Sequence, residues 1–169
     1  MNGSLTVSQF NDLAAKTSGV ITATISDEDM ATLSGLTGTE NALTITVANP
    51  SVDAAALNTL NTRTTLPVTV SSTTITGSAT DLIAVYKANS LETINGLGDE
   101  AVTLNNSSID AADLITLDNF TSGIIDVSAV NKITGSAEEI ITVYASAGIS
   151  GLGNEDITIN DARLTASSF

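Results

Sequence analysis

The chain of 169 residues contains no cysteine, no histidine and no tryptophan. Without cysteine it forms no disulfide and offers no thiol nucleophile or thiolate metal ligand. No serine has a base partner in the sequence, and no glycine-rich phosphate loop is present. Acid pairs such as Glu138 with Glu139 lie at expected helix N-termini, which lower a carboxyl pKa, whereas a general acid needs a raised pKa. The sequence therefore predicts a protein that is not an enzyme and uses no cofactor.

Basic residues are also scarce. Five Lys and Arg residues stand against nineteen Asp and Glu residues, which gives a net charge of -14. Such a chain repels phosphate backbones, so we expect no nucleic-acid partner. No apolar run reaches the ~18 residues of a membrane span, and no basic stretch followed by an apolar one opens the chain. We therefore expect no membrane insertion, and any secretion signal would lie outside this sequence.

What the sequence does contain is internal repetition. Residues 107–128 align without a gap on residues 50–71 and on residues 3–24. A second block, ITGSATDLIAVY at residues 75–86, recurs as ITGSAEEIITVY at residues 133–144. Repeats of this size predict an array in which each unit buries its apolar face against its neighbours.

Six short segments alternate apolar and polar residues with many β-branched side chains, which is typical of strands with one buried face. They begin at Ile21, Leu43, Val68, Val102, Ile125 and Ile157. We expect Val68, Val102, Ile125 and Ile157 to stack as one inward apolar column. The polar residues that follow the first position form the expected outward column, namely Thr22, Thr44, Thr69, Thr103, Asp126 and Thr158.

Two kinds of short helix are expected between these strands. Helices of the first kind have an N-cap flanked by a hydrophobic staple, with caps at Thr6, Asp53, Asp110 and Thr165. Thr6 with Gln9 forms a capping box, and Asp110 with Asp113 forms an acidic version of it. Helices of the second kind have capping boxes that begin at Ser26, Ser78 and Ser136.

Strands separated by helices are read as parallel strands with crossover connections. The predicted fold is an α/β repeat solenoid of short parallel strands and short helices, similar in architecture to leucine-rich repeats but without their consensus. Residues 1–169 form a single domain of about three strand-helix-strand-helix double repeats. Both ends fall at the same point of the repeat, which indicates a slice of a longer array. The expected partners are neighbouring repeats of the parent protein and, end to end, another copy.

Two groups of residues are candidates for a binding site. Glycine turns followed by acids recur in register, and they make Asp99, Glu100, Glu155 and Asp156 candidate calcium ligands. The alternative reading is a helix stop with an acidic, solvated turn. The Thr-rich outer strand face is a candidate ice-binding surface, although its hydroxyls also suit hydrogen bonds to water and between strands. Tyr86 and Tyr144 occupy equivalent places and are read as repeat core or rim.

The ITGSA…VY and GLGNE segments resemble repeats in very long, acidic bacterial surface proteins and exoproteins, notably the hemolysin-like ones of marine cyanobacteria. The resemblance covers roughly residues 21–162 and implies an extracellular or cell-surface location. It also implies a structural or adhesive role, which is the function we expect. The calcium nonapeptides of such proteins are absent here, so no site residue transfers. A ligand-binding module for calcium, glycans or ice is the alternative.

Overall fold

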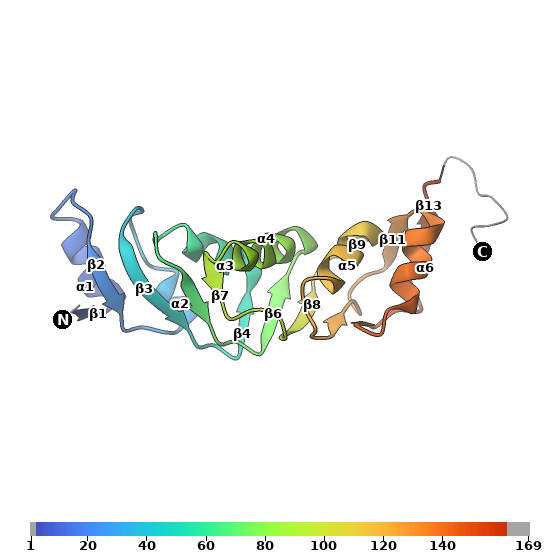
Figure 1. Ribbon diagram of the computed structural model, residues 1–169, viewed down its shortest axis with the longest axis horizontal. Helices are drawn as coiled ribbons and strands as arrows, with labels where there is room; N and C mark the ends of the chain where they lie inside the picture. The colour runs from blue at the N-terminus through green and yellow to red at the C-terminus, as the bar shows by residue number, and fades with distance from the viewer. Residues whose placement is uncertain (1–2, 162–169) are drawn as a thin grey trace.

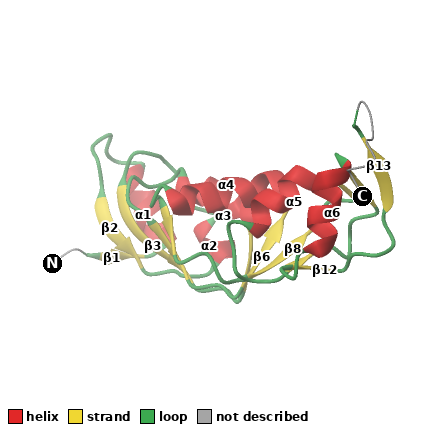
Figure 2. Cartoon of the chain, turned by 45° about the vertical axis from the view of Figure 1, so that its right-hand side comes forward, coloured by secondary structure: helices red, strands yellow, loops and turns green. Residues whose placement is uncertain are grey.

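The computed structural model describes residues 3–161 as an elongated α/β molecule with its two termini at opposite ends of the long axis (Figure 1). Among these residues there are six helices and three parallel sheets, and no sheet closes into a barrel. Most of the helices follow one another along the long axis of the molecule, and strands lie beneath and beside them (Figure 2). None of these helices is long and apolar enough to cross a membrane.

All strands within the three sheets pair in parallel. The first sheet contains β1 (Ser4–Leu5), β2 (Thr22–Ile25), β3 (Ala42–Val47), β5 (Val68–Val70) and β7 (Ile94–Asn95). The second contains β4 (Ser51–Asp53), β6 (Thr74–Gly77), β8 (Ala101–Leu104), β10 (Ile125–Asp126) and β12 (Ile149–Ser150). The third contains β9 (Ser108–Asp110), β11 (Lys132–Gly135) and β13 (Asp156–Ile159).

The helices are short, and each follows directly on one or more strands. They are α1 (Val7–Ala14), α2 (Met30–Leu33), α3 (Ala54–Asn61), α4 (Ala79–Ser90), α5 (Ala111–Asp118) and α6 (Ala137–Ala145). We call each helix, together with the strands that precede it, a unit. Helices α3 to α6 pack side by side in chain order, so each unit lies against the next one.

The predicted single apolar column is wrong, because the structure distributes those residues over three sheets. Val68 pairs with Ile45 and Ile94 in the first sheet, whereas Val102 and Ile125 pair with each other in the second. Ile157 belongs to the third sheet, where it pairs with Ile133 and is substantially exposed. Val68, Val102 and Ile125 are fully buried, as expected.

The displacement has a physical cause in the number of strands per unit. α2 follows a single strand, α3 and α4 follow two strands each, and α5 follows three. Where an extra strand such as β4 or β9 enters, it lies beside the existing sheet and starts a new one. Residues that are equivalent in the repeat therefore lie one sheet further along in the later copy, as Ile125 in the second sheet does relative to Val68 in the first.

The local capping predictions are largely confirmed. Thr6, Asp53, Asp110, Ser78 and Ser136 are all N-caps, and Thr6 and Ser136 form full capping boxes. The Ser136 backbone N–H and hydroxyl donate to the Glu139 carboxylate and hold its pKa below the usual value. Thr165 lies outside the described residues.

Three capping predictions are wrong. Ser78 accepts from the Asp81 N–H, but the Ser78 N–H does not donate back to Asp81, so its capping box is incomplete. Asp110 accepts from Ala112 without a reciprocal bond to Asp113, so no acidic capping box forms. Ser26 is not an N-cap, because α2 is one turn long and starts later, with Asp29 as its cap. Hydrogen bonds from the Asn49 side chain and from the Thr32 backbone lower the pKa of Asp29.

Side chains from the following unit cap four of the helices a second time. The first backbone N–H of each of these helices donates to an Asp or Asn side-chain oxygen from the next unit at 2.7 to 2.9 Å. The pairs are Val7 with Asp27, Met30 with Asn49, Ala79 with Asn106, and Ala137 with Asp161. Beside α3 and α5 the equivalent positions are Gly77 and Gly135, where a Cβ would lie 3.0 and 2.8 Å from the Cβ of Ala54 and Ala111.

Truncation of a buried helical leucine tests the packing between units. Leu114 of α5 is fully buried, so Leu114→Ala leaves a cavity and lowers the free energy of unfolding by about 2–5 kcal/mol. Leu91→Ala is the control, because Leu91 is 75% exposed and its truncation changes stability by less than about 0.5 kcal/mol. Urea denaturation measures both. Equal effects of the two changes would contradict the core described above.

The second set of caps is tested with two adjacent asparagines. Asn106→Ala leaves the Ala79 N–H without its acceptor and is expected to cost about 0.5–2 kcal/mol. Asn105→Ala is the matched control, because Asn105 is exposed and only its backbone N–H bonds to the previous unit. Chemical denaturation of both variants should place the loss in Asn106→Ala alone.

Candidate functional site

The glycine turn at residues 98–100 is built around the carboxylate of Glu100. Both carboxylate oxygens accept from the Gly98 N–H, at 3.0 and 2.9 Å, and one accepts from the Tyr86 hydroxyl at 3.3 Å. Glu100 is only 3% exposed, and Gly98 has a φ of 140°, which glycine adopts most readily. The turn thus fastens the end of α4 to the start of β8.

The turn at residues 153–155 repeats this arrangement one double repeat later. Both Glu155 oxygens accept from the Gly153 N–H, at 3.1 and 2.9 Å, and the Tyr144 hydroxyl donates to Glu155 at 2.7 Å. Burial alone would raise the pKa of Glu155, but the bonds from Gly153 and Tyr144 lower it overall. We call the two sets Tyr86–Glu100 and Tyr144–Glu155 the tyrosine latches.

The two latches differ in what covers them. The Phe120 ring at the end of α5 stacks on Tyr86, with ring centroids 6.0 Å apart and planes 8° from parallel. Tyr86 is fully buried, and burial with the nearby Glu100 charge raises the pKa of its phenol above the usual range. Tyr144 is 44% exposed, and partial burial and the Glu155 carboxylate raise its pKa to about 12. One tyrosine is therefore core and the other is rim.

Of the four candidate calcium ligands, two accept hydrogen bonds within these turns. Glu100 and Glu155 already accept hydrogen bonds, whereas Asp99 and Asp156 are exposed. Within residues 3–161 no group of three or more acidic side chains is arranged to hold a metal ion. Calcium binding at these turns stays a hypothesis, and it would require the glutamates to leave their present partners.

The outward threonines do not form one plane, because they follow the three sheets. Other Thr and Ser hydroxyls, outside this column of threonines, donate to backbone carbonyls of the previous unit. Examples are Thr64 to Leu43 at 2.7 Å, Thr73 to Pro50 at 3.0 Å and Ser71 to Val47 at 3.1 Å. These hydroxyls fasten successive units together.

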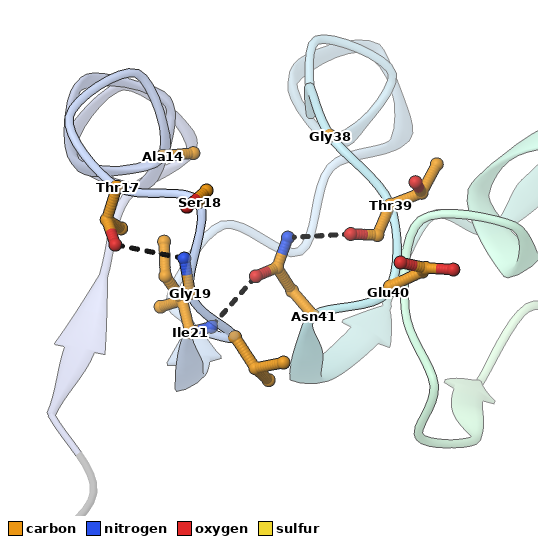
Figure 3. A pocket seen from close by; sticks show the side chains of 10 residues that line it. Ala14, Thr17, Ser18, Gly19, Ile21, Gly38, Thr39, Glu40 and Asn41 are labelled. Carbon is orange, nitrogen blue, oxygen red and sulfur yellow. Dashed lines mark hydrogen bonds between the residues drawn. The ribbon is translucent and has the colours of Figure 1, made fainter.

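A hollow of about 200 Å³ opens between the loops of the first two units (Figure 3). Residues 17–21 and 38–41 line it. Asn41 bridges the two loops, since its Oδ1 accepts from the Ile21 N–H at 2.8 Å and its Nδ2 donates to the Thr39 carbonyl at 3.1 Å. Glu40 has a φ of 62° and is exposed, and Figure 3 shows its carboxylate pointing away from Ile21.

Sequence reasoning missed both the Asn41 bridge and the left-handed backbone at Glu40 and Glu92. Positive φ is uncommon outside glycine, and no local pattern marked these glutamates. Glu92 lines a second hollow together with Thr64 and Thr93. The cross-unit caps could have been predicted from the sequence. An Asp or Asn recurs two residues after an apolar strand residue, at positions 27, 49, 106 and 161.

The tyrosine latches give a matched pair of variants. Tyr86→Phe removes a donor from a buried carboxylate and should cost about 1–3 kcal/mol, whereas Tyr144→Phe at the exposed latch should cost less. A raised phenol pKa means that its stabilisation is complete below pH 10 and is lost as the pH rises towards 12.

Absorbance of the phenolate against pH checks the two latches separately. Tyr86→Phe leaves Tyr144 as the only tyrosine, and it should ionise near pH 12 rather than 10. Tyr144→Phe leaves Tyr86, which should ionise only as the chain unfolds. Ionisation of either group at an ordinary pH of about 10 would contradict the latch.

Comparison of the chain with protein-family models, with curated proteins and with solved structures finds no match in any of the three.

Proposed function

We propose that the chain is a repeat solenoid and serves as a structural or adhesive module of a large extracellular or cell-surface protein. The observation that carries the proposal is the recurrence of the same contacts between neighbouring units. Backbone pairing, side-chain caps and Thr or Ser hydroxyls all link residues about 19 to 27 positions apart. Such contacts build a quasi-one-dimensional stack.

The surface chemistry supports the same role. A net charge of -14 keeps such a stack soluble and discourages contact with anionic surfaces. The buried polar side chains of Glu100 and Asn41 fasten turns of the chain. A scaffold needs long reach and rigid coupling between units, and the elongated shape in Figure 1 provides the reach.

An in-register deletion tests the solenoid directly. Removal of residues 50–106 joins Asn49 to Ser107 at equivalent positions of the repeat, so β10 should pair with β3 as β5 does now. We expect a folded, shorter chain that unfolds cooperatively. Removal of residues 50–94 is the control, because it joins Asn49 to Asn95 out of register and should abolish cooperative unfolding. Circular dichroism during thermal melting separates the outcomes, and loss of folding in both deletions rejects the solenoid.

The alternative of a ligand-binding module is tested by calorimetric titration with calcium and with a panel of glycans. A structural module should release or absorb no heat of binding with either. Addition of a chelator should likewise leave the melting temperature within a few degrees, because a metal that supported the fold would shift it by more, in proportion to its binding free energy. If calcium produced a saturable heat of binding and Glu155→Gln abolished it, the chain would be a calcium-binding module that uses the acidic turns.

A further inference from the structure

The end of the molecule at α6 and β13 carries an uncovered apolar face. All four residues of β13 are exposed, including Ile157 at 41% and Ile159 at 39%. Ile141 and Tyr144 of α6 are exposed beside them. Within residues 3–161, β13 pairs only with β11, so its other edge has no strand. We call β13 with Ile141 and Tyr144 the tail face.

The interior of the same chain shows what such a face binds. Ile83 and Tyr86 of α4 are the repeat equivalents of Ile141 and Tyr144, and the next unit covers them. Likewise β3 is the equivalent of β13, with Ile45 and Val47 in the places of Ile157 and Ile159. There, β5 pairs with β3 through Val68 and Val70. A parallel strand and a helix in the next place would complete the tail face.

The opposite end of the chain offers a strand and a helix of this kind. Ile21 and Ala23 are the repeat equivalents of Val68 and Val70. β1 pairs with β2 only at Thr24 and Ile25, so among residues 3–161 no strand lies along that edge at Thr22 and Ala23. The Thr24 N–H donates to Gly3 across this edge, and amide directions alternate along a strand, so the Thr22 N–H points to the same edge.

One basic side chain at the head, Lys16, matches an acidic group at the tail. Lys16, at the end of α1, occupies the repeat position of Phe120, which stacks on Tyr86. A lysine in that position over Tyr144 would place its ammonium beside an aromatic ring and the Glu155 carboxylate. Lys16 is exposed, and it is one of only five basic residues in the chain.

We propose that the tail face binds α1 and β2 of a second copy, so that β2 extends the third sheet beyond β13 and Lys16 lies over Tyr144. The contact is head-to-tail, which makes it open-ended and lets copies add in a line. The inference rests on the proposed repeat solenoid and names its partner at this end. The net charge of each copy opposes approach, so assembly should strengthen between about 0.05 and 0.5 M salt as the repulsion is screened.

Light scattering of the whole chain over a concentration and salt series tests the proposal. The wild type should show a mass that rises continuously with concentration and more strongly at high salt. Lys16→Glu should weaken the association by about five- to tenfold, the size expected for one cation–π and ion-pair contact. Lys87→Glu is the control, because it makes the same charge change at an exposed position of α4, away from both ends.

Two blocked variants then test the head-to-tail geometry. Lys16→Glu with Thr22→Pro blocks the head, and Ile141→Asp with Ile157→Asp blocks the tail; circular dichroism verifies that each is folded. Each variant alone should be monomeric, and an equimolar mixture should form a dimer and nothing larger. If either double variant fails to fold, Lys16→Glu and Ile141→Asp alone replace the pair and should still associate more tightly together than separately.

Three results would overturn the contact. A wild type that is monomeric at every concentration and salt rejects it, and a lower melting temperature of Phe169→Ser would then assign the tail face to the chain's own residues 162–169. Self-association of a blocked variant as tight as the wild type places the interface elsewhere. A 1:1 mixture that remains monomeric rejects the head-to-tail geometry. The in-register deletion retains both ends, so its failure rejects the solenoid, whereas its success beside a monomeric wild type rejects only this contact.

Discussion

The whole structure depends on parallel pairing between a strand and the strand one unit further along the chain. Parallel strands require a crossover between them, and here the crossover is a short helix or turn that returns the chain to the same edge. Each pairing brings one apolar side chain over its equivalent, as Val52, Ile75 and Val102 do in the second sheet. The caps and latches hold the crossover at the length that this pairing demands.

What the sequence predicted well is what neighbouring residues decide. The N-caps at Thr6, Asp53, Asp110, Ser78 and Ser136 depend on three or four consecutive residues, and the structure confirms them. Parallel strands with intervening helices were also predictable, because strand and helix periodicities differ. The prediction at Ser26 is wrong although its local capping pattern is intact and β2 ends directly before it, because α2 begins only at Met30 and Asp29 is its N-cap.

The sequence did not predict which sheet each strand joins, because this depends on how many strands the preceding units contain. The alternation of apolar and polar residues marks Val68 and Val102 identically, yet they belong to different sheets because β4 begins a second sheet beside the first. The candidate acids show the same limit. Glu100 and Glu155 were correctly placed in turns, but the bonds they make depend on tyrosines 14 and 11 residues earlier, in the second halves of α4 and α6.

Whether a residue in this chain is buried or exposed depends on whether another unit follows and covers it, even when two residues are equivalent in the repeat. Tyr86 and Tyr144 both follow a valine and both donate to a glutamate of the next glycine turn, but among residues 3–161 only Tyr86 lies beneath a further unit. Long-range repulsion between acidic units and short-range strand pairing act over different distances, since salt screens the first within about 10 Å at 0.1 M while the second acts only at contact. Charge therefore governs how often two units meet, and the pattern of strand edges governs the register in which they can stay together. Because the same pairing rule operates at every junction, the edges of β2 and β13 that have no strand partner within residues 3–161 retain the capacity that each interior junction has already used.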